Sequence, residues 1–260
     1  MGAIREANEQ LVVANLESQL LAEQMTQLHK EATAAIQARD DFFALISHEL
    51  RTPLTSITGW AALLERNPDS ATIAEAARSI AISAALQAQL VNDLLDVSRI
   101  MTGKFAITRT QIDFRAVAFD AMSAMNPQAA AKSVSLRMTA QDSIVVSGDA
   151  GRLRQVVGNL LSNAVKFTPA GGLIDICLTL KDSYAVLELR DSGEGIPLHF
   201  LPHVFDRNAQ ADARRFGGLG LGLAIVKHIV ELHGGSVAAA SEGEGKGATF
   251  TVCIPAVQHE

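Results

Sequence analysis

FFALISHELRTPLTSITGW, residues 42–60, is the stretch that decides how the first part of the chain folds. At about 100° per residue, Phe43, Ile46 and Leu50 gather on one side, which predicts an amphipathic helix. His48 lies nearly opposite that apolar side. We therefore expect its imidazole to face solvent.

Pro53 stands inside this expected helix, just beyond the turn that holds His48 and Glu49. It has no N–H, so the carbonyl of Glu49 loses its helical partner, and an interior proline costs roughly 3 kcal/mol. We expect a bend at this turn, and a purely structural helix gains nothing obvious from one. On these residues alone the plainer alternative, a tolerated kink beside an inert histidine, stays open.

The helix is expected to extend far upstream, because residues 4–52 contain neither glycine nor proline. Mostly apolar or small side chains recur there at alternating steps of three and four residues, at Leu11, Ala14, Ser18, Leu21, Met25, Leu28, Ala32 and Ala35. A seam this narrow predicts a coiled coil with a partner helix. The alternative is a lone helix on the surface of its own domain.

A second helix is expected after the turn sequence RNPDS, residues 66–70. Asp69 or Ser70 can cap a helix over about residues 72–101, and TGK at 102–104 ends it. Two antiparallel helices cannot bury both of their apolar faces alone. A dimer with a four-helix bundle is the economical solution.

The pattern changes after Gly103. Strands are predicted over 106–111, 134–139, 143–147, 173–180, 184–189 and 248–254, and helices over 114–132, 149–167 and 219–233. KDS at 181–183 predicts a hairpin turn. The fold class that follows is a helical region and then an α+β sandwich with a mixed sheet.

The composition of the chain excludes several classes of function. The chain has 260 residues, of which 48% are hydrophobic, so two compact units with sizeable cores are expected. A net charge of −6 without a Lys/Arg-rich block argues against a nucleic-acid binding partner. No apolar run approaches the roughly 20 residues that span a bilayer. Cys177 and Cys253 are isolated, which gives no metal-ligand spacing.

LRQVVGNLLSNAVKFT, residues 153–168, predicts a helix with one apolar face and one polar line. Asn159, Asn163 and Lys166 follow each other along that line at helical spacing. Amide oxygens suit Mg²⁺, and a lysine suits phosphate. The alternative is an ordinary solvated face.

LELRDSGEGIP, residues 187–197, reads as a strand that ends in a carboxylate and two glycines. Asp191 could accept a hydrogen bond from an exocyclic amine such as that of adenine. Gly193 and Gly195 would let the backbone approach a flat base. Alone this pattern is weak, since it also describes many turns.

FGGLGLGLAIVKHIVELHGG, residues 216–235, is a glycine-rich loop that opens into an apolar helix. Free N–H groups at a helix N-terminus suit phosphate. The spacing of Gly218, Gly220 and Gly222 does not match the dinucleotide fingerprint, and the chain has no P-loop motif.

Together with SHELRTP (47–53), these three stretches in this order resemble the sensor histidine kinases of two-component signalling, over about residues 40–256. The resemblance implies a coiled-coil signalling helix at 1–40 and a dimerisation and histidine-phosphotransfer hairpin at 41–103. It also implies an ATP-binding domain at 104–260, of the kind found in type II topoisomerases and mismatch-repair ATPases.

The resemblance also implies roles in the hairpin. His48 resembles the phosphoacceptor, Glu49 the acid that takes its proton, and Thr52 the residue that positions water for dephosphorylating a partner. A hinge near residues 101–104 would bring this hairpin and the ATP-binding domain together.

In the ATP-binding domain, Asn163 resembles the Mg²⁺ ligand, with Asn159 close by. Lys166 resembles a phosphate contact and Asp191 the carboxylate that reads adenine, beside Gly193 and Gly195.

Gly218, Gly220 and Gly222 resemble the hinge of an ATP lid, and Arg207 resembles a lid arginine that reaches the γ-phosphate. Asn208 stands where an aromatic is common, which puts the docking of the lid in doubt. Ala248 replaces a frequent hydroxyl residue, which puts one polar contact near the nucleotide in doubt.

The activity implied is that of a histidine kinase that uses ATP and Mg²⁺ and passes the phosphoryl group to an aspartate of a response regulator. A homodimer, a cytoplasmic location and an upstream sensor domain outside this chain are implied as well. The alternatives are an ATP-gated clamp or chaperone-like ATPase and a non-enzymatic dimerisation scaffold. Within the family, the net activity could also be phosphatase action on the partner.

Overall fold

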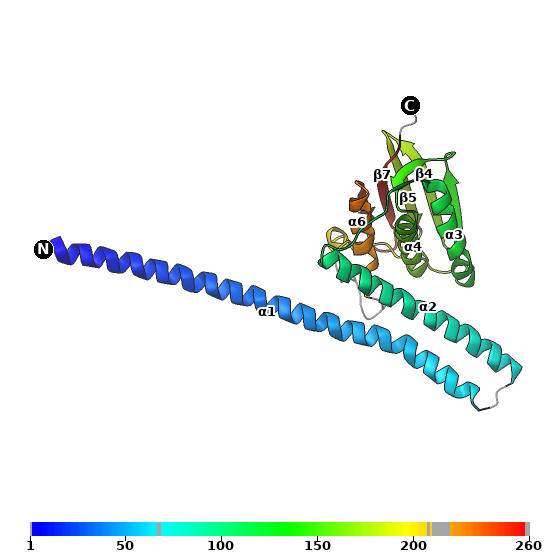
Figure 1. Cartoon of the computed structure of the whole chain (residues 1–260), viewed down its shortest axis with the longest axis horizontal. Helices are drawn as coiled ribbons and strands as arrows, with labels where there is room; N and C mark the ends of the chain where they lie inside the picture. Colours follow the sequence, from blue (N-terminus) through cyan, green and yellow to red (C-terminus); the bar gives the residue numbers. More distant parts are fainter. Residues whose placement is uncertain (1, 67–68, 207–208, 210–218, 258–260) are drawn as a thin grey trace. The chain divides into compact units, whose positions relative to one another are not determined.

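The computed structural model describes residues 2–66, 69–206, 209 and 219–257. Side chains at positions 3–18, 31, 34, 35, 38, 39, 41 and 42 of the first helix lie outside this description. The chain forms two compact units, Met1–Thr52 and Pro53–Glu260. Figure 1 follows the chain through its elements in sequence order.

The first unit is made of helix α1, which spans Gly2–Leu64 and continues into the second unit. Its hydroxyl side chains donate to carbonyls one turn back, Thr26 to Ala22 at 2.7 Å and Ser47 to Phe43 at 2.8 Å, as is common for exposed helical positions. The predicted long helix is confirmed, and it includes Pro53. The bend expected at this proline stays a prediction.

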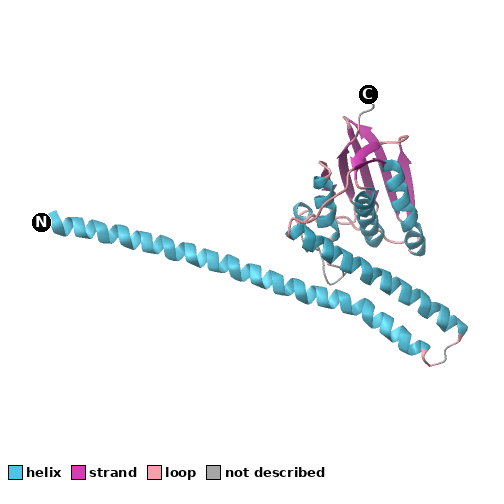
Figure 2. Cartoon of the chain, viewed as in Figure 1, coloured by secondary structure: helices cyan, strands magenta, loops and turns pink. Residues whose placement is uncertain are grey.

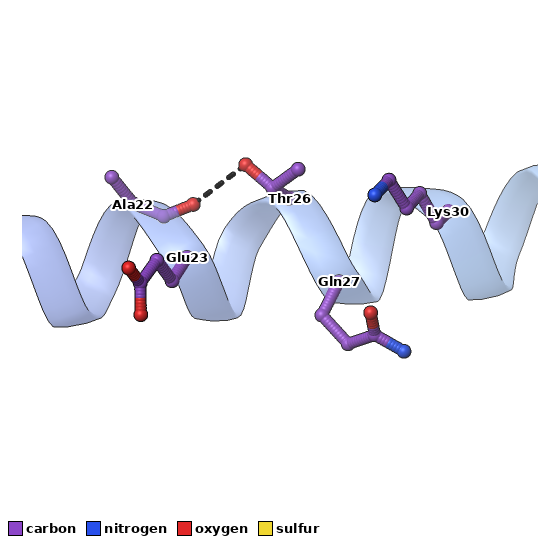
Figure 3. Close-up of a pocket in the computed structure, with 5 residues that line it drawn as sticks. All are labelled: Ala22, Glu23, Thr26, Gln27 and Lys30. Atoms are coloured by element: carbon purple, nitrogen blue, oxygen red, sulfur yellow. Dashed lines mark hydrogen bonds between the residues drawn. The ribbon is translucent and has the colours of Figure 1, made fainter.

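The seam of α1 is apolar surface in the single chain. Leu21, Met25 and Leu28 are 59%, 72% and 64% exposed. The seam positions Leu11, Ala14, Ser18 and Ala35 fall on side chains outside the description. Figure 3 shows a shallow hollow on the same helix, lined by Ala22, Glu23, Thr26, Gln27 and Lys30. All five belong to α1, so the hollow is a gap between neighbouring side chains of one helix.

The second unit begins with the end of α1 and with α2, which spans Ser70–Met101. Asp69 caps α2, because its Oδ1 accepts a 2.7 Å hydrogen bond from the Thr72 N–H. Ser83 on α2 donates to Ser56 on α1 at 3.1 Å, which places these two stretches side by side. The predicted helical hairpin is therefore present.

A five-stranded sheet forms the centre of the domain that follows, in the order β2-β4-β5-β7-β6. Its strands are β2 (Ser135–Ala140), β4 (Leu173–Lys181), β5 (Tyr184–Asp191), β6 (Ser236–Ala240) and β7 (Thr249–Pro255). β2 and β4 run parallel, and the other neighbours are antiparallel. A separate antiparallel pair joins β1 (Thr110–Asp113) to β3 (Val145–Gly148). The predicted mixed sheet is confirmed.

The core lies between one face of this sheet and the helices α3 (Phe114–Ala131), α4 (Ala150–Phe167) and α6 (Gly222–Leu232), which Figure 2 shows in cyan against the magenta strands. β7 alternates half-buried and buried residues along its length, as a strand with one covered face does. The short helix η1 (Leu201–His203) follows β5.

One strand was missed by the sequence prediction, and several boundaries differ from it; β3, for example, begins at Val145 instead of residue 143. β6 was not predicted, because SVAAA has little intrinsic strand preference, and its pairing with β7 determines the strand. β1 begins at Thr110 instead of residue 106, where its antiparallel pairing with Gly148 starts. α6 also begins later than predicted, at Gly222 instead of residue 219.

No helix among the described residues is long and apolar enough to cross a membrane.

Candidate functional site

His48 lies on the exposed side of α1, as predicted, with its side chain 74% exposed. Its Nδ1 is 3.3 Å from Oε1 of Glu49, whose own side chain is only 19% exposed. A proton on Nδ1 can therefore be held by this carboxylate, which leaves the lone pair on Nε2 of a largely exposed ring. This is the arrangement that a nucleophilic imidazole requires.

Thr52 follows one turn later. Its hydroxyl donates to the carbonyl of His48 at 3.2 Å. The hydroxyl oxygen thus stays on the same exposed side of α1 as the imidazole, where it can still accept a hydrogen bond from water.

In the second unit, α4 carries the predicted polar line. Asp149 caps this helix, with Oδ1 accepting from the Arg152 N–H at 3.1 Å. Asn159, Asn163 and Lys166 are all half-buried, since they border the apolar face that packs on the sheet. The Lys166 ammonium lies 5.1 Å from the ring centroid of Phe167.

Asn159 is joined to the start of α6. Its Nδ2 donates to the carbonyl of Gly222 at 3.3 Å. The structure therefore brings together one member of the polar line and one of the predicted lid-hinge glycines, which lie 63 residues apart in the sequence.

Asp191 ends β5 in a nearly buried position, 7% exposed. Its Oδ1 accepts from the N–H groups of Gly193 at 2.9 Å and Ala248 at 3.2 Å. Within the part of the chain that the structure describes, both of these hydrogen bonds end on Oδ1. Oδ2 can therefore accept from a further donor. Burial raises the pKa of this carboxyl, and the two backbone hydrogen bonds partly oppose that effect.

The glycines after Asp191 are needed by the chain itself. A Cβ on Gly193 would lie 2.7 Å from the carbonyl oxygen of Phe167. Gly195 has φ +72° and passes against Gly243. Close approach of the backbone was predicted here for a flat base, and the structure shows that the chain's own packing already demands it.

The glycine-rich loop is described from Leu219 onward. Gly220 has φ +64°, and its neighbours Leu219 and Leu221 are buried, which fixes the loop on both sides of that glycine. Arg207 and Gly218, two of the predicted site residues, lie outside the described residues, as does Asn208.

Thr168 is a polar group that the sequence analysis did not single out. It is fully buried at the end of α4, and its Oγ1 is a buried side-chain atom without a hydrogen-bond partner among the described residues. A hydroxyl at the end of the polar line was the available signal. This orphaned oxygen, together with the open Oδ2 of Asp191, fits a domain that receives a polar ligand.

No group of three or more His, Cys, Asp or Glu side chains that could hold a metal ion occurs within the described ranges. Any cation bound here would need other donors, and the amide oxygens of the α4 line are of the right chemical type.

Two family models match the chain. The family described as "His Kinase A (phospho-acceptor) domain" matches residues 38–103. The family described as "Histidine kinase-, DNA gyrase B-, and HSP90-like ATPase" matches residues 148–258. The first contains His48, and the second contains the α4 line, Asp191 and the glycine-rich loop.

Curated relatives are similar over most of this chain. It is 36% identical over 272 residues to hybrid signal transduction histidine kinase D of Dictyostelium discoideum, covering 85% of this chain and 18% of that protein. It is 37% identical over 245 residues to the circadian input-output histidine kinase CikA of Thermosynechococcus vestitus, covering 89% and 34%. The chain thus spans about a third or less of the length of these relatives.

Solved structures of histidine kinases are similar to this chain as well. The mycobacterial sensor histidine kinase MprB superposes with a TM-score of 0.53 at 28% identity, over 58% of this chain and 100% of that chain. Full-length ShkA in complex with AMPPNP superposes with a TM-score of 0.63 at 27% identity, over 85% and 46%. The chain belongs to the sensor histidine kinases of two-component systems.

Proposed function

We propose that this chain is an ATP-dependent protein histidine autokinase that phosphorylates its own His48. The observation that carries the proposal is the exposed imidazole with Nδ1 next to Glu49, inside the matched phospho-acceptor domain. An inert surface histidine needs no such partner. A histidine that accepts a phosphoryl group gains from one.

The reaction is an in-line transfer. Nε2 of neutral His48 attacks the γ-phosphorus of ATP, and a new N–P bond forms. The bond from the γ-phosphorus to the bridging oxygen breaks, and its electron pair leaves with ADP. The imidazole then carries a positive charge, which Glu49 stabilises by accepting the hydrogen bond, or the proton, from Nδ1. Most of the catalysis is positioning and charge neutralisation.

The matched ATPase family implies ATP binding by the second unit. Asp191 would accept the adenine amine on Oδ2. The end of α4 that carries the buried Thr168 hydroxyl lies nearby, because a Cβ on Gly193 would meet both the Phe167 carbonyl oxygen and Asp191 Oδ1. Gly193 and Gly195 would border the base. Asp191 and its glycines thus recognise the nucleotide, while other residues hold its phosphates.

The proposed function also includes a Mg²⁺ ion, bound by side chains of the α4 polar line. Asn163 would supply an amide oxygen to the cation, with Asn159 beside it and Lys166 on a phosphate. When bound, the cation would neutralise phosphate charge. Arg207, Gly218, Gly220 and Gly222 would form the lid that closes over these phosphates.

A homodimer is supported by apolar surface on both helices of the hairpin region. Leu54 on α1 is 49% exposed, and Ile82 on α2 is 70% exposed. In a monomer these side chains stay in water, whereas a four-helix arrangement would cover them. We propose the division into a signalling helix (1–40), a phosphotransfer hairpin (41–103) and an ATP-binding domain (104–260).

The second acceptor would be an aspartate of a response regulator, and a sensor domain upstream would control the kinase. Thr52 would position water when the same hairpin dephosphorylates that partner, so phosphatase action is part of the proposal. Because ATP is the substrate, we place the reaction in the cytoplasm.

The test is incubation of the purified chain with Mg·ATP that carries a radiolabelled γ-phosphate. Phosphohistidine is labile in acid and stable in alkali, so the proposal predicts label with that signature. An ATP-gated clamp would release phosphate without labelling the protein. A dimerisation scaffold would bind no fluorescent ATP analogue.

A further inference from the structure

Asp96 is a charged side chain for which the reaction above gives no role, and it is nearly buried. Its side chain is 7% exposed, and its Oδ2 lies 2.8 Å from Nη1 of Arg152, which is 23% exposed. The same Oδ2 accepts from Nε2 of Gln155 at 2.8 Å. Arg152 also donates from Nη1 to Oε1 of Gln155 at 2.8 Å.

These contacts form a closed triangle of three side chains. Asp96 belongs to α2, whereas Arg152 and Gln155 lie in the first two turns of α4. α4 is the helix that carries the polar line with Asn163. The triangle therefore joins the helical hairpin to the nucleotide-handling helix of the ATP-binding domain.

Phe105 follows residues 102–104, the short linker after α2, and packs against Arg152 of the triangle. Its ring is 7% exposed and lies under the Arg152 guanidinium, 4.3 Å from its centroid to Cζ. The ring also meets His228 of α6 edge-on at 5.5 Å. Gly103, at φ +65°, makes the turn between α2 and Phe105. The chain is thus held just before and just after this turn.

The contact between α2 and α6, next to the triangle, is loosely packed. A hollow of about 240 Å³ lies between α2 and α6, lined by Val97, Ile100, Phe205, Asp206, Ala224, Ile225, Lys227, His228 and Glu231. A loosely packed surface of mixed polarity fixes no single orientation. A buried, hydrogen-bonded ion pair does, because only one geometry satisfies all three of its side chains.

We propose that Asp96 is a positioning residue for the phosphorylation of His48. By holding Arg152, it fixes α4 to the hairpin, so that the ATP-binding domain is attached at two points and not by the short linker alone. This inference rests on the proposed kinase function. A second attachment limits the positions that the ATP-binding domain samples about the hairpin, which raises the effective concentration of bound ATP at His48 without changing the affinity for ATP.

A merely structural role for Asp96 makes a different prediction. If the triangle only stabilised the fold, its loss would lower thermal stability and leave the turnover of folded protein unchanged. The distinguishing readout is therefore the rate of His48 phosphorylation at saturating ATP, compared with the dissociation constant for a fluorescent ATP analogue.

The experiment uses the full chain with Asp96→Ala, Asp96→Asn and Asp96→Glu. Asp120→Asn is the matched control, because Asp120 forms an exposed 3.5 Å pair with Arg154 on the same helix α4. We expect Asp96→Ala to lower the phosphorylation rate at saturating ATP about fivefold or more, with analogue affinity unchanged. Asp96→Asn, which keeps the shape and one acceptor, should fall between, and Asp96→Glu should recover part of the rate.

A second readout does not depend on catalysis. Spin labels at Ala88→Cys on α2 and Ala238→Cys on β6, with Cys177 and Cys253 replaced by serine, report the distance between the hairpin and the ATP-binding domain. Both labelled positions are exposed. The distance distribution should broaden in Asp96→Ala and stay narrow in Asp120→Asn.

An Asp96→Ala variant that is folded and phosphorylates His48 at the wild-type rate or faster overturns the positioning role. An unchanged distance distribution overturns it as well. A wild-type chain that forms no phosphohistidine overturns the proposed kinase function first, and this role with it. The two failures are therefore distinguishable.

Discussion

Asn159 donates a hydrogen bond from Nδ2 to the carbonyl of Gly222, 3.3 Å away, and so links α4 to the first residue of α6. The polar line on α4 and the glycine-rich segment are therefore one connected structure. An amide was expected here for its oxygen. The structure shows that the side-chain nitrogen of Asn159 also forms a hydrogen bond, to the first residue of α6.

Asn159→Asp tests this link. The carboxylate keeps the oxygen atoms but cannot donate to Gly222, so the loop loses an anchor. We expect the affinity for a fluorescent ATP analogue to fall about threefold or more, the value of one neutral hydrogen bond. Ser162→Ala, an exposed position on the same helix, is the control and should leave the affinity unchanged. Equal affinities for both variants would contradict the anchoring role.

His233 predicts a pH-dependent stability. It is 1% exposed, accepts from the Asp149 N–H at Nε2 (3.0 Å), and has Nδ1 2.7 Å from the Ile229 carbonyl. Burial lowers its pKa below the ordinary value of 6.5, and the nearby Arg109 charge adds to this, whereas the Ile229 hydrogen bond and Asp149 oppose it.

Because the folded pKa is the lower one, the unfolded chain binds the proton first as the pH falls. The stabilising contribution of neutral His233 is therefore complete above pH 6.5 and is lost as the pH drops below it. We expect the free energy of unfolding to differ between wild type and His233→Gln at about pH 8, and the difference to shrink towards about pH 5. His199→Gln, at an exposed histidine, should show no such trend. A constant difference across this range would refute the assignment.

Asp93 predicts a pH dependence of stability opposite to that of His233: its contribution is lost as the pH rises. Burial, with a smaller contribution from the Asp96 charge, raises the pKa of this carboxyl to about 6, and the hydrogen bond from Gln89 partly opposes the shift. The folded chain therefore keeps its proton to a higher pH than the unfolded chain does. Wild type loses stability as the pH rises from 3.8 to about 6.

Asp93→Asn removes this titration. Relative to wild type, the variant should gain stability over that interval and keep the gain above it, as measured by chemical denaturation at a series of pH values. Glu75→Gln, an exposed carboxylate on the same helix, is the matched control. A gain that is already complete at about pH 4 would show that some other property of the introduced amide causes it.

Local chemistry explains most of what the sequence predicted. The turn at residues 181–183 was predicted from KDS, and Asp182 and Ser183 do adopt positive φ angles there, at 47° and 67°. Asp69 or Ser70 was predicted as the cap, and Asp69 is the one that accepts from the Thr72 N–H. These features depend on residues a few positions apart, and their energetics are visible in a short window.

Features made by distant residues were not predicted. β6 exists because β7 pairs with it, and its alanines alone carry too little preference for a strand. The Asp96–Arg152 pair joins residues 56 positions apart on two helices, each of which has an ordinary polar pattern. The apolar spacing showed which side of each helix is buried, but not which charged groups meet across the boundary.

The central claim is that His48 takes the γ-phosphoryl group of ATP. Its most direct test compares wild type, His48→Gln and His29→Gln with radiolabelled ATP, where His29 is another exposed histidine on α1. We predict acid-labile label on wild type and His29→Gln, none on His48→Gln, and equal binding of the fluorescent analogue by all three. Acid-labile label that persists on His48→Gln would contradict the account.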